Sequence, residues 1–247
     1  MTGDAQAETL KDVFAEDYLY FHERFLDGPR ADQEATIAAA LTNAPIGGRV
    51  LDLCCGHGRL SRRFAAGGYA VDGIDLSAFF IATAQAADAK TAYVQADALA
   101  TPYADASFDA AYCWFTSFGL QEDADLQAML REARRVLKPG ARLAIDLANR
   151  DLLITGFQQF NVLNRDGDML IDRNEMDVVS GKLWITRTSR RSGRPTATRR
   201  FFLRQFTPPE IAGWMTAAGF ADIRFAGDGG REFGPTSLAM IVVGTAV

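Results

Sequence analysis

Residues 50–61, VLDLCCGHGRLS, gather an aspartate, two adjacent cysteines, a histidine and two glycines. A structural zinc site needs spaced pairs of ligands in a closed set of four, which adjacent cysteines do not provide. Adjacent cysteines also form a disulfide only with strain. We therefore expect neither a metal site nor a redox pair. Cys54 and Cys55, together with the distant Cys113, are interpreted as small packing residues of a chain in a reducing compartment.

The two glycines of this stretch, Gly56 and Gly58, lie between a predicted strand and a predicted helix. Glycine tolerates unusual backbone dihedrals and lets a ligand approach the main chain. The start of a helix offers free N–H groups and a partial positive charge. This context predicts a loop that cradles a cofactor. The spacing Gly56-x-Gly58-x-x-Ser61, with Asp75 about 20 residues further on, also nearly matches a dinucleotide fingerprint.

Three carboxylates distinguish between the candidate cofactors. Asp52 lies inside the first strand, where it would repel a pyrophosphate and attract an ammonium group. Asp75 ends the second strand, where an acid accepts hydrogen bonds from a ribose, and Asp97 ends the third, where it can bind an exocyclic amine. An ammonium, a ribose diol and an adenine together indicate S-adenosylmethionine (SAM). The alternative left open by the glycine spacing is an NAD(P)-dependent dehydrogenase.

Strands and helices alternate along the middle of the chain. Short apolar runs predict buried strands, and the segments between them read as helices, one with Ser77 as its N-cap. The predicted strands are residues 49–55, 70–75, 91–97, 108–115 and 141–149, and the predicted helices are 59–68, 77–89 and 123–137. This alternation indicates βαβ units. We expect an α/β fold with a Rossmann-like, seven-stranded, mostly parallel sheet and helices on both faces.

Different patterns flank this core. Residues 5–42 read as helical with a break at Gly28-Pro29. Asp-Gly and Ser-Gly turns separate alternating segments, which predict antiparallel strands at 169–179, 182–191 and 198–206. A helix at 208–218 and strands at 221–227 and 238–245 complete the sheet. The predicted organisation is a single domain, 1–247, with a helical cap at 1–44, a core at 45–155 and 207–247, and a β insertion at 156–206.

The loop motif and three others resemble one family. VLDLCCGHG resembles the strand-one loop of class I SAM-dependent methyltransferases, usually LDLGCGTG, and GIDLS, QADA and REARRVLKPGARLAID resemble later motifs of that family. The resemblance is close over about residues 49–149 and looser over 203–247. One departure is Cys54, where the family often has glycine. It matters only if this position needs a glycine-like backbone conformation.

The resemblance implies roles for the matched positions. Asp52 and the loop backbone would hold the methionine moiety, Asp75 the ribose hydroxyls, and Asp97 with the Ala98 N–H the adenine edge, while Leu76 packs on the adenine. Capping of turns or helices is the alternative role for the aspartates. The residues expected at the cofactor are Asp52, Cys54, Gly56, Gly58, Asp75, Leu76, Asp97, Ala98 and Trp114.

The acceptor is expected outside the carboxyl ends of the strands, as ligands are in open α/β sheets. Candidates follow the fourth strand and lie in the loop 228–237, with ordinary loop packing as the alternative; they are Thr116, Ser117, Phe118, Arg231, Glu232 and Phe233. In the cap, Tyr18 and His22 belong to an aromatic cluster that otherwise reads as helix-packing core. His22 is the candidate general base and Tyr18 a candidate to reach the sulfonium or the acceptor, whereas His57 is interpreted as a loop residue.

Charge excludes some partners. The net charge of −5 argues against a general nucleic-acid binder. No apolar stretch has the length of a membrane span, and the N-terminus lacks a signal-peptide pattern, so we expect a cytoplasmic protein.

Residues 182–204 contain eight basic residues and no acidic one. We interpret this basic run as a solvated hairpin, a wall that attracts an acidic acceptor, or a contact between two copies of the chain.

These observations predict methyl transfer from SAM to a nitrogen or oxygen of a small molecule, a metabolite or natural product, releasing S-adenosylhomocysteine (SAH). Proximity and orientation would supply most of the rate. A non-catalytic SAM-binding protein is the rival from another class, and it predicts cofactor binding without a pocket that faces the methyl group.

Overall fold

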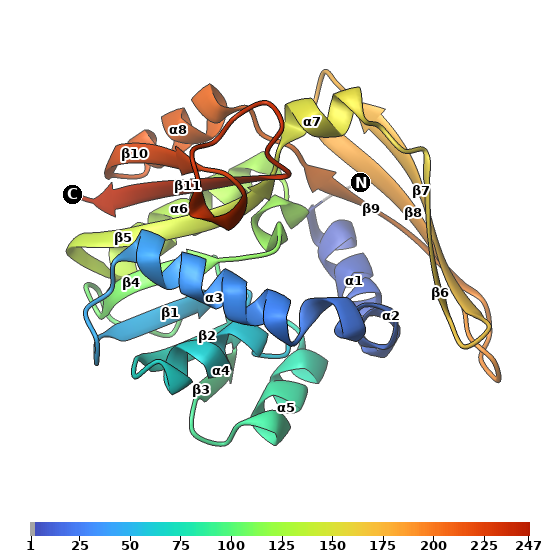
Figure 1. The fold of residues 1–247 in the computed structure, drawn as a ribbon, viewed down its shortest axis with the longest axis horizontal. Helices are drawn as coiled ribbons and strands as arrows, with labels where there is room; N and C mark the ends of the chain where they lie inside the picture. Colours follow the sequence, from blue (N-terminus) through green and yellow to red (C-terminus); the bar gives the residue numbers. More distant parts are fainter. Residues whose placement is uncertain (1–2) are drawn as a thin grey trace.

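A seven-stranded sheet forms the centre of the molecule, and a second, four-stranded sheet stands beside it (Figure 1). The computed structural model describes the backbone of residues 3–247 and the side chains of residue 6 and residues 9–247. The central sheet has the order β10-β11-β5-β4-β1-β2-β3. Its strands are β1 (Arg49–Leu53), β2 (Ala70–Asp75), β3 (Ala92–Gln95), β4 (Phe108–Cys113), β5 (Leu137–Ala148), β10 (Phe220–Ala226) and β11 (Ala239–Ala246). The strand β11 runs antiparallel to both of its neighbours, and the other pairs of this sheet are parallel.

The apolar runs of the sequence become the inner strands because helices cover both faces of a parallel sheet. On one side pack α3 (Pro29–Thr42) and α4 (Arg59–Ala66), and on the other α6 (Asp123–Val136) and α8 (Pro208–Ala217). The helix α5 (Ala78–Ala87) packs on β2 and β3. The register aligns Leu53 with Cys113 and with Ile74. The strands β1, β2 and β4 therefore end at one edge, and their loops converge there.

The second sheet is an antiparallel wall at the right of Figure 1, in the order β6-β7-β8-β9. It follows α7 (Arg150–Thr155) and consists of β6 (Phe160–Arg165), β7 (Asp168–Asp177), β8 (Lys182–Arg190) and β9 (Ala197–Arg204). Between the two sheets lie α1 (Gly3–Val13) and α2 (Glu16–Leu26). Val13 and Phe14 from this cap pack with Leu183, Ile185 and Phe201 of the wall.

The structure confirms the predicted fold class, and it corrects three details. The cap has a second break at residues 14–15, which separates α1 from α2. The insertion has four strands and not three, because β6 pairs with β7 through a turn at Asp166 and Gly167, whose φ values are 53° and 87°. The strand β5 begins at Leu137, earlier than predicted. No helix among residues 3–247 combines the length and apolar character that a bilayer span requires.

Candidate active site

The loop between β1 and α4 has an unusual backbone. Cys54, Gly56 and Gly58 have φ values of 60°, 55° and 74°, all in the left-handed region that favours glycine. A Cβ on Gly56 would have no atom within 4 Å, so the space beside this residue is open to a ligand. A Cβ on Gly58 would lie 2.5 Å from the hydroxyl of Tyr93. Gly56 therefore leaves room for a cofactor, while Gly58 lets the loop pack against β3.

Cys54 departs from the family pattern at a position where the departure matters. A residue with a side chain held at φ 60° stores strain on the order of 1 kcal/mol or more. Its thiol interacts with the buried thiol of Cys113, the last residue of β4. All three cysteines are free, and Cys55 packs with Ile81, Ala84 and Tyr93, as expected for packing residues.

Asp75 ties this loop to the end of β2. One carboxylate oxygen accepts a hydrogen bond from the Gly56 amide at 2.9 Å, and the other accepts one from the Ser77 amide at 2.8 Å. Burial raises the pKa of Asp75, and the two amides oppose that rise. Each oxygen keeps a second lone pair for a further donor such as a ribose hydroxyl. The adjacent Leu76 is 40% exposed, so an apolar surface lies beside this carboxylate.

Asp97 lies beyond the end of β3, next to β2. Its Oδ1 accepts a hydrogen bond from the Leu99 amide at 2.9 Å, and the side chain is exposed. Ala98 is buried against the core. The Ala96 amide donates to the Asp75 carbonyl at 3.1 Å, which brings the two strand ends together. The predicted ribose and adenine contacts thus share one edge of the sheet.

Asp52 is placed differently from the expectation. Its side chain is 3% exposed, and Oδ2 accepts hydrogen bonds from the hydroxyls of Ser61 at 2.6 Å and Tyr112 at 2.9 Å. Burial raises the pKa of Asp52 to about 7. This carboxylate anchors α4 beneath the loop. Its predicted contact with an ammonium group stays a prediction.

Two residues of the loop after β4 that were predicted at the cofactor and the acceptor, Trp114 and Phe118, have buried side chains. Trp114 is 6% exposed and packs in the core under α3, and Phe118 is 1% exposed with its ring 5.7 Å from that of Phe206. Their contacts with a cofactor or an acceptor stay predictions. The hydroxyls of Thr116 and Ser117 bond to carbonyls of their own loop.

Phe115, which the sequence reasoning passed over, occupies the key position of this loop. Both Phe115 and Thr116 have left-handed φ values, 60° and 58°, and such strain in residues with side chains concentrates at functional sites. Asp146 of β5 holds this conformation, because its Oδ2 accepts from the Phe115 amide at 2.9 Å and its carbonyl from the Thr116 amide at 3.1 Å. The guanidinium groups of Arg30 and Arg59 lie over the Phe115 ring, 5.1 and 5.4 Å from its centroid.

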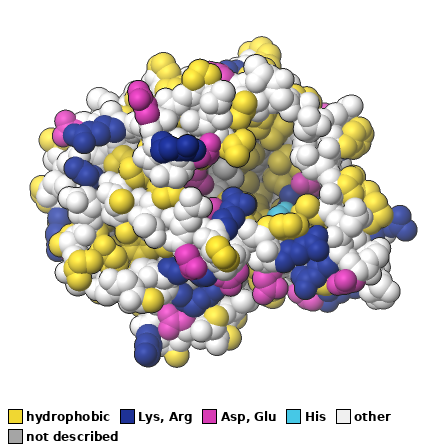
Figure 2. Space-filling view, in the orientation of Figure 1, with side chains coloured by type: hydrophobic (Ala, Val, Ile, Leu, Met, Phe, Trp, Pro, Cys, Tyr) yellow, Lys and Arg dark blue, Asp and Glu magenta, His cyan; other side chains and the backbone are white. Residues whose placement is uncertain are grey.

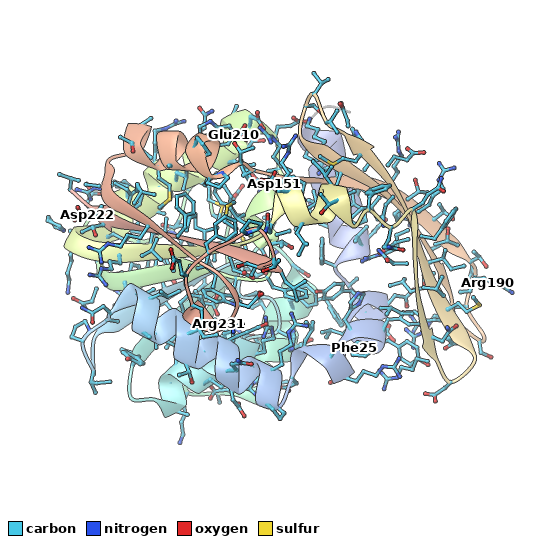
Figure 3. All side chains as sticks on the ribbon, turned by 45° about the horizontal axis from the view of Figure 1, so that its top comes forward. Phe25, Asp151, Arg190, Glu210, Asp222 and Arg231 are labelled. Carbon is cyan, nitrogen blue, oxygen red and sulfur yellow. The ribbon has the colours of Figure 1, made fainter. Side chains whose placement is uncertain are left out.

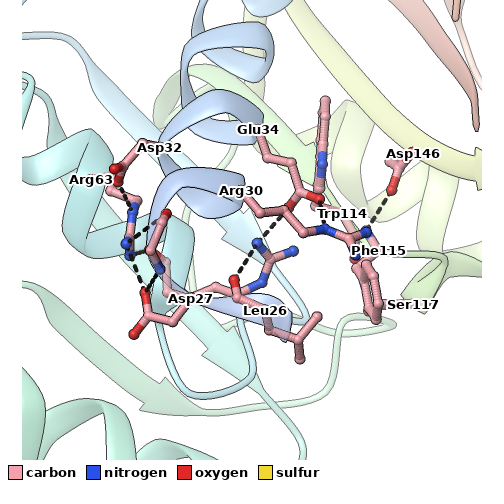
Figure 4. Close-up of polar contacts among 12 residues, drawn as sticks. Leu26, Asp27, Arg30, Asp32, Glu34, Arg63, Trp114, Phe115, Ser117 and Asp146 are labelled. Carbon is pink, nitrogen blue, oxygen red and sulfur yellow. Dashed lines mark hydrogen bonds and ion pairs between the residues drawn. The ribbon is translucent and has the colours of Figure 1, made fainter. Parts of the chain in front are cut away.

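A cluster of charges, drawn in Figure 4, covers the Phe115 ring. The two oxygens of Glu34 pair with Arg30, at 2.8 Å, and with Arg59. Arg59 is 6% exposed and also approaches the carbonyl of Leu26 at 3.4 Å. Two cations thus share one carboxylate beside the strained loop. Sequence reasoning missed this cluster, since Arg30 and Glu34 read as ordinary residues of a helix.

Comparison with known proteins agrees with this geometry. Residues 50–140 match a family model described as a methyltransferase domain. A 2-phytyl-1,4-naphtoquinone methyltransferase of Nostoc punctiforme (strain ATCC 29133 / PCC 73102) is 41% identical over 119 residues, which are 44% of this chain and 50% of that protein. A malonyl-[acyl-carrier protein] O-methyltransferase of Erwinia pyrifoliae (strain DSM 12163 / CIP 106111 / Ep16/96) is 43% identical over 95 residues, 38% of this chain and 35% of that protein. The chain spans half the length or less of these two curated relatives.

Similarity to a solved structure extends over most of the chain. The CcbJ methyltransferase from Streptomyces caelestis matches with a TM-score of 0.76 at 20% identity, over 90% of this chain and 91% of that one. Residues 50–140 are thus similar to a methyltransferase domain, and the fold of the chain resembles that of a solved methyltransferase. SAM is the cofactor that the sequence resemblance implies, and three observations fit its binding. They are the open space at Gly56, the exposed Leu76 beside Asp75, and the buried Nε2 of His57, which has no hydrogen-bond partner among the described residues.

The cap places Tyr18 and His22 between the methyltransferase core and the wall. Their rings stack at 4.3 Å, and Tyr18 also lies 6.0 Å from Phe80 of α5. Burial lowers the pKa of His22 to about 4, and that of Tyr18 is raised by burial to about 12. A histidine with so low a pKa is a poor proton acceptor. The structure therefore weakens the prediction that His22 is the general base.

The loop 228–237 has two exposed candidate residues and one that packs against the core. Arg231 and Glu232 are exposed, and Arg231 donates to the Asp228 carbonyl at 3.1 Å. Figure 3 shows Arg231 on this loop at the surface, beside α3. Phe233 packs against the core with its ring 6.3 Å from that of Phe225. Their role at an acceptor stays a prediction.

The basic run of the insertion is neutralised by the protein itself. Among the described side chains, seven of its eight cations pair with carboxylates. These carboxylates lie in the cap, in β7, in α6 and the residue before it, and in α8. The pairs are Lys182 with Glu122, Arg187 with Asp172, Arg191 with Glu16 and Asp17, Arg194 with Glu16, Arg199 with Asp12, Arg200 with Glu175, and Arg204 with Asp123 and Glu210. Five of these cations therefore join the insertion to the cap, α6 and α8, and two pair within the insertion. Attraction of an acidic acceptor and a contact between two copies of the chain stay predictions.

A hollow lies where this cap, the wall and the carboxyl edge of the central sheet meet. Figure 2 shows it in the upper middle of the view, lined largely by hydrophobic atoms. Among the described side chains, those of residue 6 and residues 9–247, no group of three or more histidines, cysteines, aspartates or glutamates is arranged to hold a metal ion.

Proposed function

We propose that this chain transfers a methyl group from SAM to a nitrogen or oxygen atom of a small molecule and releases SAH. The main support for this proposal is the position of Asp75. Its carboxylate fixes the left-handed loop at Gly56 and keeps lone pairs for the ribose. The family match and the two methyltransferase relatives support the same reaction.

The residues of the chain divide the work between cofactor and acceptor. The loop 54–58, Asp75 and Asp97 would hold the cofactor at the ends of β1, β2 and β3. When bound, SAM supplies an electrophilic methyl group on a positively charged sulfur. The loop 114–117 and the hollow beside it would position the acceptor in line with that methyl group. Alignment of this kind contributes most of the rate of such a transfer.

The partners proposed for the chain follow from the same features. The apolar hollow fits a small-molecule acceptor, and the net charge of −5 disfavours nucleic acid. The three free cysteines support a reducing compartment such as the cytoplasm.

Isothermal titration with SAM, SAH and NAD tests the cofactor assignment. We expect micromolar binding of SAM and SAH by the wild type and a loss of at least about 10-fold in Asp75→Ala, because the carboxylate holds both the loop and the ribose. The exposed Asp105→Ala serves as the control and should bind as the wild type does. Binding of NAD without SAM would overturn the proposal in favour of a dehydrogenase.

A further inference from the structure

Asp146 lies at the edge of the sheet where the acceptor is expected, one residue beyond the pair that aligns Ile145 of β5 with Cys113 of β4. It lies in β5, and β4 with its strained loop separates β5 from β1. Neighbouring strands are about 4.8 Å apart, so Asp146 lies roughly 10 Å across the sheet from the cofactor loop. The methyl group would lie above β4, between the two. A side chain on β5 is then well placed to contact the atom that receives the methyl group.

One oxygen of Asp146 is available for a ligand. Oδ2 accepts from the Phe115 amide at 2.9 Å, whereas Oδ1 has no hydrogen-bond partner among the described residues. The side chain is partly accessible, and no cation forms an ion pair with it within the described part of the chain. This oxygen is open to a donor from outside the protein, and an acceptor bound beside the loop after β4 can supply one.

The charge of Asp146 itself favours a donor of positive charge. Arg30 and Arg59 from α3 and α4 are both paired with Glu34, and their guanidinium groups lie over the Phe115 ring. This cluster carries one positive charge in excess, which Asp146 balances. Charge-assisted hydrogen bonds from an ammonium to a carboxylate are stronger than those from a neutral hydroxyl. Asp146 thus favours an amine over an alcohol.

We propose that Asp146 binds the amine nitrogen of the acceptor through Oδ1 and receives one of its protons. The inference rests on the methyl transfer proposed above and names its substrate class. The bound ammonium first gives one proton to Oδ1, which frees the nitrogen lone pair, and Oδ1 passes that proton to solvent. The lone pair then forms the new N–CH₃ bond while the C–S bond of SAM breaks, the electron pair of that bond stays on sulfur as SAH, and the product is the methylated ammonium. Asp146 is thereby assigned as a catalytic residue.

The electrostatics of the site agree with this role. Burial raises the pKa of Asp146 to about 7, Glu34 raises it further, and the Phe115 amide, Arg59 and Arg30 oppose the rise. The other titratable neighbour is the Cys113 thiol, whose own pKa is raised well above its usual value. A carboxylate with a pKa near neutrality is a better base than an ordinary aspartate.

Matched pairs of small amines and alcohols test the inference on the SAH-bound protein. The probes are benzylamine with benzyl alcohol, cyclohexylamine with cyclohexanol, and glucosamine with glucose. Asp146→Asn is the informative variant, because its amide oxygen can still accept from Phe115 while an NH₂ group replaces the free oxygen. We expect the wild type to bind at least one amine about 10-fold more tightly than its alcohol, by titration calorimetry, and the variant to lose this preference.

The outcomes separate the inference from the proposed function. SAH must bind wild type, Asp146→Asn and the exposed control Asp105→Asn alike; if SAH fails to bind the wild type, the proposed function has failed. With SAH bound, an amine preference in none of the three pairs, or one that persists in Asp146→Asn, would overturn the role of Asp146. For an amine that is methylated, the rate at low pH should rise with pH in the wild type and lose this limb in the variant.

Discussion

Three enclosed carboxylates, Asp52, Asp75 and Asp146, hold the edge of the sheet where the loops converge. Each accepts hydrogen bonds from hydroxyls or backbone amides that would otherwise move freely. Asp52 fastens α4, Asp75 fastens the loop after β1, and Asp146 fastens the loop after β4. A side chain that fixes two neighbouring segments in this way preorganises a site before its ligand arrives.

The residue types of the site were partly readable in the sequence. Asp75 and the glycines stand at strand ends, where spacing alone predicts their place. Asp146 lies within an apolar strand segment, ARLAIDLAN. A single carboxylate that interrupts such a segment is the signal from which Asp146 could have been predicted as a site residue. Phe115 and Phe118 could not be told apart, because two successive left-handed residues reverse the direction in which side chains point.

The raised pKa of Asp52 predicts how the free energy of unfolding depends on pH. Its pKa of about 7 in the folded protein exceeds the unfolded value of 3.8, so the folded state binds more protons between these values and the free energy of unfolding falls as pH rises from about 4 to 7. A difference of one pKa unit between the two states corresponds to about 1.4 kcal/mol, so the fall is on the order of 2–4 kcal/mol. Urea denaturation at pH 5, 6, 7 and 8 should show a shallower fall for Asp52→Asn. Parallel curves for the two proteins would contradict the assignment.

At the scale of elements, the insertion and the cap are joined by ion pairs that sequence reading did not foresee. Arg191 bonds to Asp17 at 2.8 Å across a separation of 174 residues, and Arg199 bonds to Asp12 at 2.8 Å. Local pattern predicts that β strands form in this region but carries no information on which distant carboxylates they meet. The strand β6 was also missed, since its apolar residues Phe160 and Val162 stay exposed at the edge of the wall.

These pairs should differ widely in their contribution to stability. The Arg204 side chain is 7% exposed and contacts Asp123 and Glu210, whereas that of Arg199 is 42% exposed. Loss of a buried cation leaves its partners uncompensated, so Arg204→Met should lower the free energy of unfolding by about 2–4 kcal/mol. Arg199→Met should lower it by less than about 1 kcal/mol. Urea denaturation of both variants measures the difference, and equal losses would refute the distinction.

The whole molecule combines two modes of cohesion. The central sheet is held by large apolar clusters on both faces, and these fold features follow from the alternation of apolar runs that the sequence displays. The wall and the cap share only a small apolar cluster and rely more on charge. The overall architecture was therefore predictable, but the attachment of the wall was not.

Added salt should weaken the ion pairs between the wall and the cap more than it weakens the apolar packing of the central sheet. Raising sodium chloride from about 0.05 to 0.5 M shortens the screening length from roughly 14 to 4 Å and weakens partly exposed pairs. Amide hydrogen exchange in α2, where Glu16 and Asp17 meet Arg191 and Arg194, should accelerate about 2- to 5-fold, while β1 and β4 stay unchanged.

The control is Arg191→Met, in which α2 should exchange faster at low salt and respond less to added salt. A uniform acceleration across α2 and the central strands would show instead that salt acts on global stability.

The internal neutralisation of the basic run also sets the unit in which this molecule can be recombined. A graft that exchanged residues 156–206 alone would leave Asp12, Glu16 and Asp17 without their cations. The cap and the insertion lie at opposite ends of the chain's first 206 residues, yet they behave as one transferable module. An exchange between related chains should therefore move both segments together.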